Sequence, residues 1–232
     1  MANKLPTVLV GMVTPSHFYY PREHVSNMLN MMSYSYERGV IKKTILYESA
    51  SPSTALNRNN VLEKALKYEA NYALMIDTDM TFEMDLLFHL IKTSENNPGC
   101  VVSGIGCIGK PPFFPAMYTW NKDIEDHHEH ILGWDEMKLL KVDAVGSFGM
   151  LIPLDVIKKL PKDPFDHIYE FFPEKEKQAE REMRHDMAFS KRCRDAKIPI
   201  IINPQVKLGH LRLYSSTVDD YKLNRDFKKP NV

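Results

Sequence analysis

The sequence predicts an α/β fold with a mixed, mostly parallel central sheet flanked by helices. Short apolar runs alternate with stretches of helical spacing from residue 7 to about residue 105, which is the βαβαβαβ order of a parallel sheet covered on both faces. One of these runs, residues 72–76, leads directly into Asp77 and Asp79. Two carboxylates therefore stand at the carboxyl end of a strand, where open α/β sheets hold their ligands.

The first half is expected to contain four strands and three helices. Residues 8–13 form an apolar run that predicts the first strand, ending at Thr14 and Pro15. Residues 22–38 carry apolar side chains at helical spacing, and Gly39 supplies the stop. The other expected elements are a strand at 44–47, a helix at 53–68, the strand that ends in Asp77, a helix at 85–93 and a strand at 100–105.

The second half loses this alternation after the proline-rich residues 110–115. Residues 117–134 are polar, aromatic and rich in histidine, and the acidic and histidine run at 126–130 is interpreted as a solvated loop rather than a metal site. Later expected elements are strands at 139–145 and 150–152, a charged helix at 174–184, a clearer helix at 186–196, a strand at 198–202 and a polar extension from residue 213. With no repeat or linker, we expect a single domain over residues 1–232, in halves of about 7–105 and 106–212.

Composition limits the classes of partner. The 232 residues are 44% apolar and 26% charged, which is ordinary for a globular protein with a sizeable core. Lys and Arg number 30, as do Asp and Glu, so the overall charge gives no reason to expect binding to nucleic acid or an anionic membrane. Cys100, Cys107 and Cys193 have no C-x-x-C spacing and are expected to be reduced thiols of a cytoplasmic protein.

The polar first six residues do not open a signal peptide, and no apolar stretch approaches the roughly 18 residues that cross a bilayer. We therefore expect a soluble protein without a transmembrane segment, and the oligomeric state stays open.

Six motifs follow one another along the chain. They are Thr14-Pro15, Arg58-Asn59-Asn60, Asp77-Thr78-Asp79, the segment 142–149, His185-Asp186 before a helix, and Gly209-His210 after the last expected strand. This order resembles that of the GT-A glycosyltransferases, particularly the small stand-alone enzymes of bacteriophages and large viruses, over roughly residues 7–212. The resemblance implies a GT-A fold whose first half binds a nucleotide sugar. It places the enzyme in the cytoplasm, which is the host's if the gene is viral.

The D-x-D motif of this family corresponds to Asp77 and Asp79. By resemblance, Asp79 ligates a metal ion, and Asp77 lies near the nucleotide ribose or reaches the metal through water. His210 takes the place of a third ligand, and an imidazole beside a carboxylate favours Mn²⁺ over Mg²⁺. Such an ion neutralises the charge of a departing nucleoside diphosphate. The residues alone also allow an aspartate pair that caps the next helix and an ordinary surface histidine.

Asp186 corresponds to the carboxylate that inverting members of the family use as general base on the acceptor hydroxyl. It also precedes a good helix, where aspartate is a preferred N-cap, and one residue can do both. The chain departs from the family here, because the usual pair is Glu-Asp or Asp-Asp and this chain has His185-Asp186.

Further positions complete the expected nucleotide site. Thr14 and Pro15 end the first strand, where the resemblance places the nucleobase, and Thr78 lies within the D-x-D motif. Arg58 is expected to face the nucleotide or to pair with Asp77; the alternative is an arginine on the helix surface.

Gly146 and Gly149 resemble the segment under the donor sugar, where missing side chains permit close approach of the backbone. A turn between two strands explains these glycines equally well. Tyr118, Trp120 and Trp134 are candidates for an acceptor wall, because sugar rings commonly stack on aromatic faces, and core packing is the alternative.

Together these features predict a metal-dependent glycosyltransferase that moves a sugar from a nucleotide-diphosphate donor to a glycan or other hydroxyl acceptor, with inversion. UDP-sugars are the commonest donors of such enzymes and GDP-sugars come next. The alternatives are a retaining transferase, in which Asp186 is only a helix cap, and an inactive carbohydrate-binding or assembly protein. A nucleotidyltransferase would need a basic, glycine-rich loop after the first strand, and residues 14–18 are neither.

Overall fold

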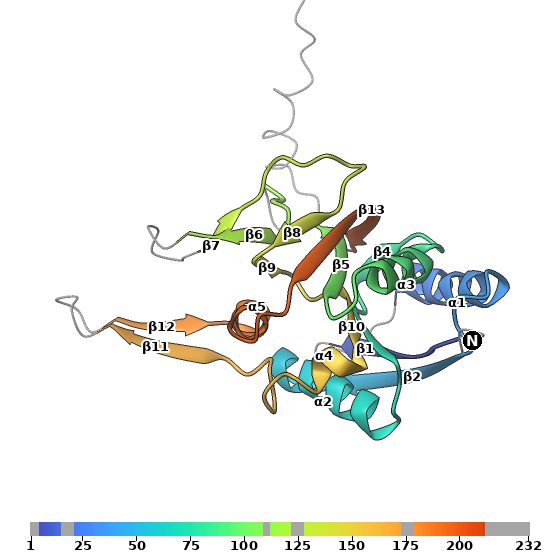
Figure 1. Ribbon diagram of the computed structural model, residues 1–232, viewed down its shortest axis with the longest axis horizontal. Coiled ribbons are helices and arrows are strands. Elements are labelled where there is room, and N and C mark those ends of the chain that lie inside the picture. Colours follow the sequence, from blue (N-terminus) through green and yellow to red (C-terminus); the bar gives the residue numbers. More distant parts are fainter. Residues whose placement is uncertain (1–4, 15–20, 109–111, 122–127, 173–178, 212–232) are drawn as a thin grey trace, which may run out of the picture.

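The computed structural model describes residues 5–14, 21–108, 112–121, 128–172 and 179–211. Its elements surround a central sheet (Figure 1). In the first half these are β1 (Thr7–Thr14), α1 (Arg22–Glu37), β2 (Lys43–Ala50), α2 (Thr54–Lys67), β3 (Tyr72–Asp77), β4 (Met80–Phe82), α3 (Leu86–Asn96) and β5 (Val101–Gly106). All seven predicted elements of this half are present; β2 and α3 run further than expected, and the short strand β4 was not predicted.

The second half contributes more strands than expected. Its elements are β6 (Met117–Trp120), β7 (His128–His130), β8 (Leu140–Val142), β9 (Ala144–Val145), β10 (Gly149–Pro153), α4 (Leu154–Ile157), β11 (Ile168–Phe172), β12 (Ala179–Met183), α5 (His185–Asp195) and β13 (Ile200–His210). β13 runs eight residues beyond the predicted strand, and α4 was not predicted.

The central sheet has the order β2-β1-β3-β10-β5-β13-β4, with β8 also paired to β13, among the described residues. β2, β1, β3, β5 and β13 run in one direction, because each parallel pair is joined to the next directly or through antiparallel β10. The predicted mixed, mostly parallel sheet is therefore confirmed. β10 of the second half lies between β3 and β5 of the first, so both halves build the same sheet.

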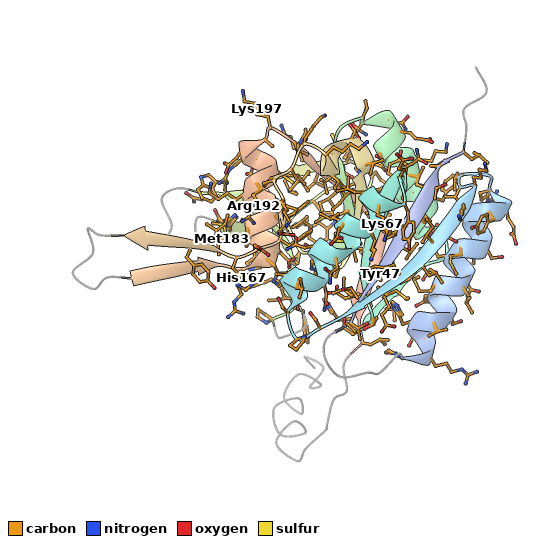
Figure 2. All side chains as sticks on the ribbon, turned by 90° about the horizontal axis from the view of Figure 1, so that it is seen from below. Tyr47, Lys67, His167, Met183, Arg192 and Lys197 are labelled. Atoms are coloured by element: carbon orange, nitrogen blue, oxygen red, sulfur yellow. The ribbon has the colours of Figure 1, made fainter. Side chains whose placement is uncertain are left out.

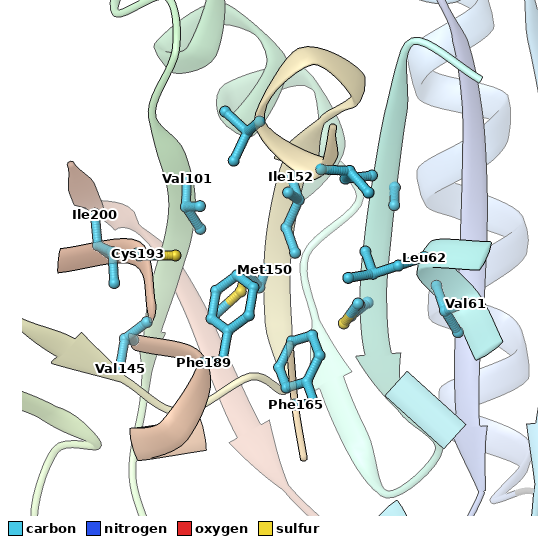
Figure 3. Packing of buried hydrophobic residues seen from close by; sticks show 14 of the residues in the cluster. Val61, Leu62, Val101, Val145, Met150, Ile152, Phe165, Phe189, Cys193 and Ile200 are labelled. Carbon is cyan, nitrogen blue, oxygen red and sulfur yellow. The ribbon is translucent and has the colours of Figure 1, made fainter. Parts of the chain in front are cut away.

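Two apolar clusters cover the two faces of this sheet. One packs side chains of α2, α4 and α5 against the sheet, and in it the rings of Phe165 and Phe189 stack at 4.3 Å (Figure 3). The other packs α1 and α3 against the opposite face. A Cβ atom on Gly11 of β1 would overlap Val61 of α2, so the missing side chain lets α2 lie close to the sheet.

Three predictions for the second half were wrong. The charged stretch expected to be helical forms β12 from 179 onward, paired with β11 in a ribbon that projects from the body (Figure 1). Pairing with a neighbouring strand has overridden its helical propensity; residues 173–178 lie outside the described part. The strand expected at 139–145 breaks at Asp143, whose carboxylate accepts a hydrogen bond from the Trp120 amide.

The third wrong prediction is the solvated loop, since His128–His130 form β7, which pairs with β6. The other two residues of that run, Asp126 and His127, lie outside the described part.

Cys100, Cys107 and Cys193 are free thiols. No helix in the described ranges is long and apolar enough to cross a membrane.

Candidate active site

Arg58 is the centre of the candidate site. It projects from α2 and is 2% exposed. Its Nη1 donates a hydrogen bond of 2.6 Å to the Ser147 carbonyl, and its Nη2 lies 3.1 Å from both carboxylate oxygens of Asp77. Its Nε is 3.7 Å from Oδ1 of Asp186. One buried guanidinium thus joins the carboxylate that ends β3 to the carboxylate at the start of α5. Of the three possibilities for Arg58, the structure has the pairing with Asp77.

Asp186 lies in the first turn of α5, whose N-cap residue is Arg184, so Asp186 is not the cap itself. The Ser147 hydroxyl donates a hydrogen bond of 2.6 Å to Oδ1 of Asp186. Nε2 of His185 lies 3.3 Å from the same oxygen. A helix N-terminus and a hydroxyl donor both stabilise a carboxylate in its ionised form.

The ionisation of Asp77 depends on opposing influences. Burial raises the pKa of Asp77 to about 6, Arg58 opposes this rise, and the negative charges of Asp186 and Asp79 add to it. Oδ1 of Asp77 is buried and, within the described residues, has no hydrogen-bond donor besides the ion pair with Arg58. A cationic ligand at this end of β3 would favour the ionised carboxylate.

Asp79 and His210 belong to neighbouring backbone segments at the other side of the site. β4 and β13 pair antiparallel with His210 opposite Met80, and the Leu211 amide donates a hydrogen bond of 2.7 Å to the Asp79 carbonyl. The His210 ring lies edge-on to Phe148 at 5.1 Å. Across the described ranges no group of three or more His, Cys, Asp or Glu side chains has metal-binding geometry. A carboxylate and an imidazole thus belong to adjacent paired segments, and donors of these two types are ones that Mn²⁺ accepts.

The predicted nucleotide positions are mostly buried. Thr14 is 1% exposed, and its hydroxyl donates a hydrogen bond of 3.2 Å to Glu48 at the same end of the sheet. Thr78 is 2% exposed, and its amide donates to the Val13 carbonyl. Pro15 lies outside the described residues.

The two predicted glycines meet tight packing from within the protein. A Cβ atom on Gly146 would overlap the Phe148 ring, and one on Gly149 would overlap Leu208. Internal packing therefore favours glycine at both positions, whatever lies above them.

The aromatic candidates have different surroundings. The Arg194 guanidinium covers the ring of Trp120 at 3.6 Å, and Trp134 packs against the apolar core. Burial raises the pKa of the Tyr118 hydroxyl, and the negative charge of Asp186 adds to the rise. Of the three aromatic candidates, Tyr118 is the one whose ionisation responds to a residue of the candidate site.

Ser147 is the site residue that sequence reasoning missed. It was seen only as part of a turn between glycines, whereas its carbonyl and hydroxyl bind Arg58 and Asp186. A hydroxyl residue between two packing glycines was the available signal, but its partners lie 89 and 39 residues away in sequence.

Comparison with known proteins identifies the fold. No protein-family model matches the chain, and no curated protein matches its sequence. Among solved structures, A197 from STIV superposes with a TM-score of 0.55 at 13% identity, over 88% of this chain and 86% of that one. GalNAc-T7, solved with UDP, GalNAc and Mn²⁺, superposes with a TM-score of 0.54 at 10% identity over 95% of this chain. The chain spans 47% of the length of GalNAc-T7. These similarities confirm the GT-A fold predicted from the sequence.

Proposed function

We propose that the protein is a metal-dependent glycosyltransferase that moves a sugar from a nucleotide-diphosphate donor to a hydroxyl acceptor. The observation that carries the proposal is the placement of Arg58 between Asp77 and Asp186, at the carboxyl end of the sheet. The two carboxylates, which we assign to the donor and to the acceptor, thereby lie together at that end of the sheet, where open α/β sheets bind nucleotides.

The donor side of the site comprises the ends of β1 and β3. Asp77 faces the ribose, and the end of β1, at Thr14 and Pro15, faces the nucleobase. Gly146 and Gly149 lie under the transferred sugar. We propose a UDP-sugar as donor, with a GDP-sugar as second candidate; the complex of GalNAc-T7 with UDP supports this order.

Asp79 and His210 are the residues that would hold Mn²⁺, or Mg²⁺ in its place, with Asp77 reaching the ion through water. The bound ion neutralises the negative charge of the departing diphosphate. With two protein ligands, diphosphate oxygens and water would have to supply the remaining ligands of such an ion.

Asp186 acts as the general base. Ser147 and His185 occupy the surroundings of Oδ1, which leaves Oδ2 for the acceptor. The acceptor oxygen forms its bond to the anomeric carbon on the face opposite the diphosphate, and its proton passes to Asp186 as the bond from that carbon to the diphosphate oxygen breaks. The product has inverted configuration.

A thermal-shift screen of the common nucleoside diphosphates, each with and without Mn²⁺, tests the proposal. We expect one base to raise the melting temperature most, and only with Mn²⁺, because a ligand bound to the native state alone stabilises it. Binding without transfer of any sugar would favour an inactive carbohydrate-binding protein. No metal-dependent shift with any nucleotide would refute the proposed function.

A further inference from the structure

His185 is the closest titratable side chain to the proposed base. Its Nε2 lies 3.3 Å from Oδ1 of Asp186, and its side chain is 23% exposed, so it reaches solvent. The ring of His167 lies 6.1 Å away at an interplanar angle of 24°. His185 therefore has both Asp186 and a second imidazole as neighbours.

This arrangement is fixed from the far end of α5. Nη1 of Arg192 donates hydrogen bonds to the carbonyls of Pro164 and Asp166, at 2.8 and 2.6 Å, and so ties the segment before His167 to the helix. Figure 2 shows His167 at the base of the projecting β11–β12 ribbon, beside α5. The Arg192 side chain therefore fixes the segment that leads into His167 against the helix that carries His185.

The charged groups around His185 come from three elements. Burial lowers the pKa of His185; the Asp186 carboxylate opposes this, and Arg58 of α2, His167 and Arg184 lower the pKa further. The ring is consequently neutral at pH 7, and a neutral imidazole can accept a proton.

We propose that His185 takes the acceptor's proton from Asp186 and releases it to water, so that the two side chains act as a two-residue base. The inference rests on the proposed function and adds a second proton acceptor to it. It uses the tautomer with hydrogen on Nδ1, which presents the lone pair of Nε2 to Asp186.

The proton is accounted for at each step. The acceptor hydroxyl gives it to the Asp186 carboxylate as the new glycosidic bond forms, and the diphosphate leaves with the electron pair of the broken bond. A water molecule relays the proton from Oδ2 to the Oδ1 side of the carboxyl group, where Nε2 of His185 accepts it. This restores the carboxylate, and the imidazolium loses a proton to solvent. At low pH, His185 is already protonated and pairs with Asp186, so transfer slows.

The pH profile of His185→Asn tests this step. Asparagine cannot take the proton, so we expect kcat at pH 7.5 to fall about tenfold, toward the low end of acid–base effects, with the donor KM within about twofold. The acid limb of kcat/KM should move to lower pH, because protonation of His185 no longer contributes to it and only carboxylates, among them Asp77, remain. An unchanged acid limb with unchanged kcat would overturn the proposal.

His167→Asn is the matched variant, and it should move the acid limb of the pH profile in the opposite direction. It removes a group that lowers the pKa of His185, so the acid limb should move to higher pH. A shift in the same direction as His185→Asn would contradict the assignment. Thermal unfolding of both variants tests whether either has merely lost structure.

Imidazole NMR separates failure of this inference from failure of the proposed function. In the wild type, the His185 signal should titrate below about pH 6.5, the ordinary value, and in Asp186→Asn at still lower pH, because the carboxylate that favours the charged ring is gone. If no nucleotide sugar is turned over, the titration still shows whether the charge of Asp186 affects the protonation of His185. Identical His185 titrations in both proteins would refute it.

Discussion

The two sides of the candidate site are built differently. On one side, Arg58 is buried and joins Asp77 and Asp186 through side-chain contacts within the protein. On the other side, β4 pairs with β13, and Asp79 and His210 stand at partly exposed positions beside this pairing. We infer that folding alone sets the first side, whereas the proposed metal ion and diphosphate would complete the second. Substitutions on the first side should therefore lower the stability of the ligand-free protein. Substitutions on the second side should instead abolish ligand binding.

Arg58→Met should have the largest effect. It leaves the Asp77 and Asp186 carboxylates without their shared cation, and removing one partner of a buried ion pair costs about 3–5 kcal/mol. Urea unfolding measures this loss. Arg38→Met is the control, since Arg38 is exposed and stacks on Tyr34, an interaction worth under about 1 kcal/mol. Equal losses in the two variants would contradict a special role for Arg58.

Asp186→Asn should act on catalysis while sparing the donor site. Asparagine keeps the shape and can still accept from Ser147, but it cannot accept the acceptor's proton. We expect kcat to fall by about 10²–10⁴ with the thermal shift by nucleotide and Mn²⁺ unchanged. Turnover close to that of the wild type would instead favour a retaining transferase.

Asp79→Asn and His210→Ala should leave the ligand-free protein nearly as stable as the wild type. The Mn²⁺-dependent stabilisation by nucleoside diphosphate, worth about 2.7 kcal/mol at a hundredfold excess over Kd, should disappear in both. Differential scanning calorimetry with and without the ion measures this. A retained metal-dependent shift would place the ion elsewhere.

Gly146→Ala should have the smallest effect and disturb both sides at once. The new methyl group displaces the Phe148 ring, which packs against His210 and follows Ser147 in sequence, at a cost of about 1–3 kcal/mol. Gly133→Ala is the control, because a Cβ atom there meets nothing within 4 Å. If Gly133→Ala lowers the free energy of unfolding as much as Gly146→Ala does, the effect of Gly146→Ala does not come from displacement of the Phe148 ring.

Sequence reasoning found the elements that local periodicity determines. The apolar run before Asp77, the helix that carries Arg58 and the helix that starts beside Asp186 all lie where predicted. The placement of β10 between β3 and β5, and the pairing of β4 with β13, depend on contacts between distant segments. No local pattern encodes these pairings.

The same distinction applies to the site. The pairing of Arg58 with Asp77 was one of three stated possibilities, because both lie at the same end of neighbouring elements. The double role of Ser147 was out of reach, since it arises only when β9 and β10 bring that turn between α2 and α5.

Release of nucleoside diphosphate from nucleotide sugars tests the central claim most directly. With Mn²⁺ and a panel of UDP- and GDP-sugars, the wild type should release the diphosphate from one of them, and chelation of the ion should stop the release. Asp79→Asn should be inactive under the same conditions. Equal release by the wild type and Asp79→Asn, or no release from any donor, would contradict a metal-dependent glycosyltransferase.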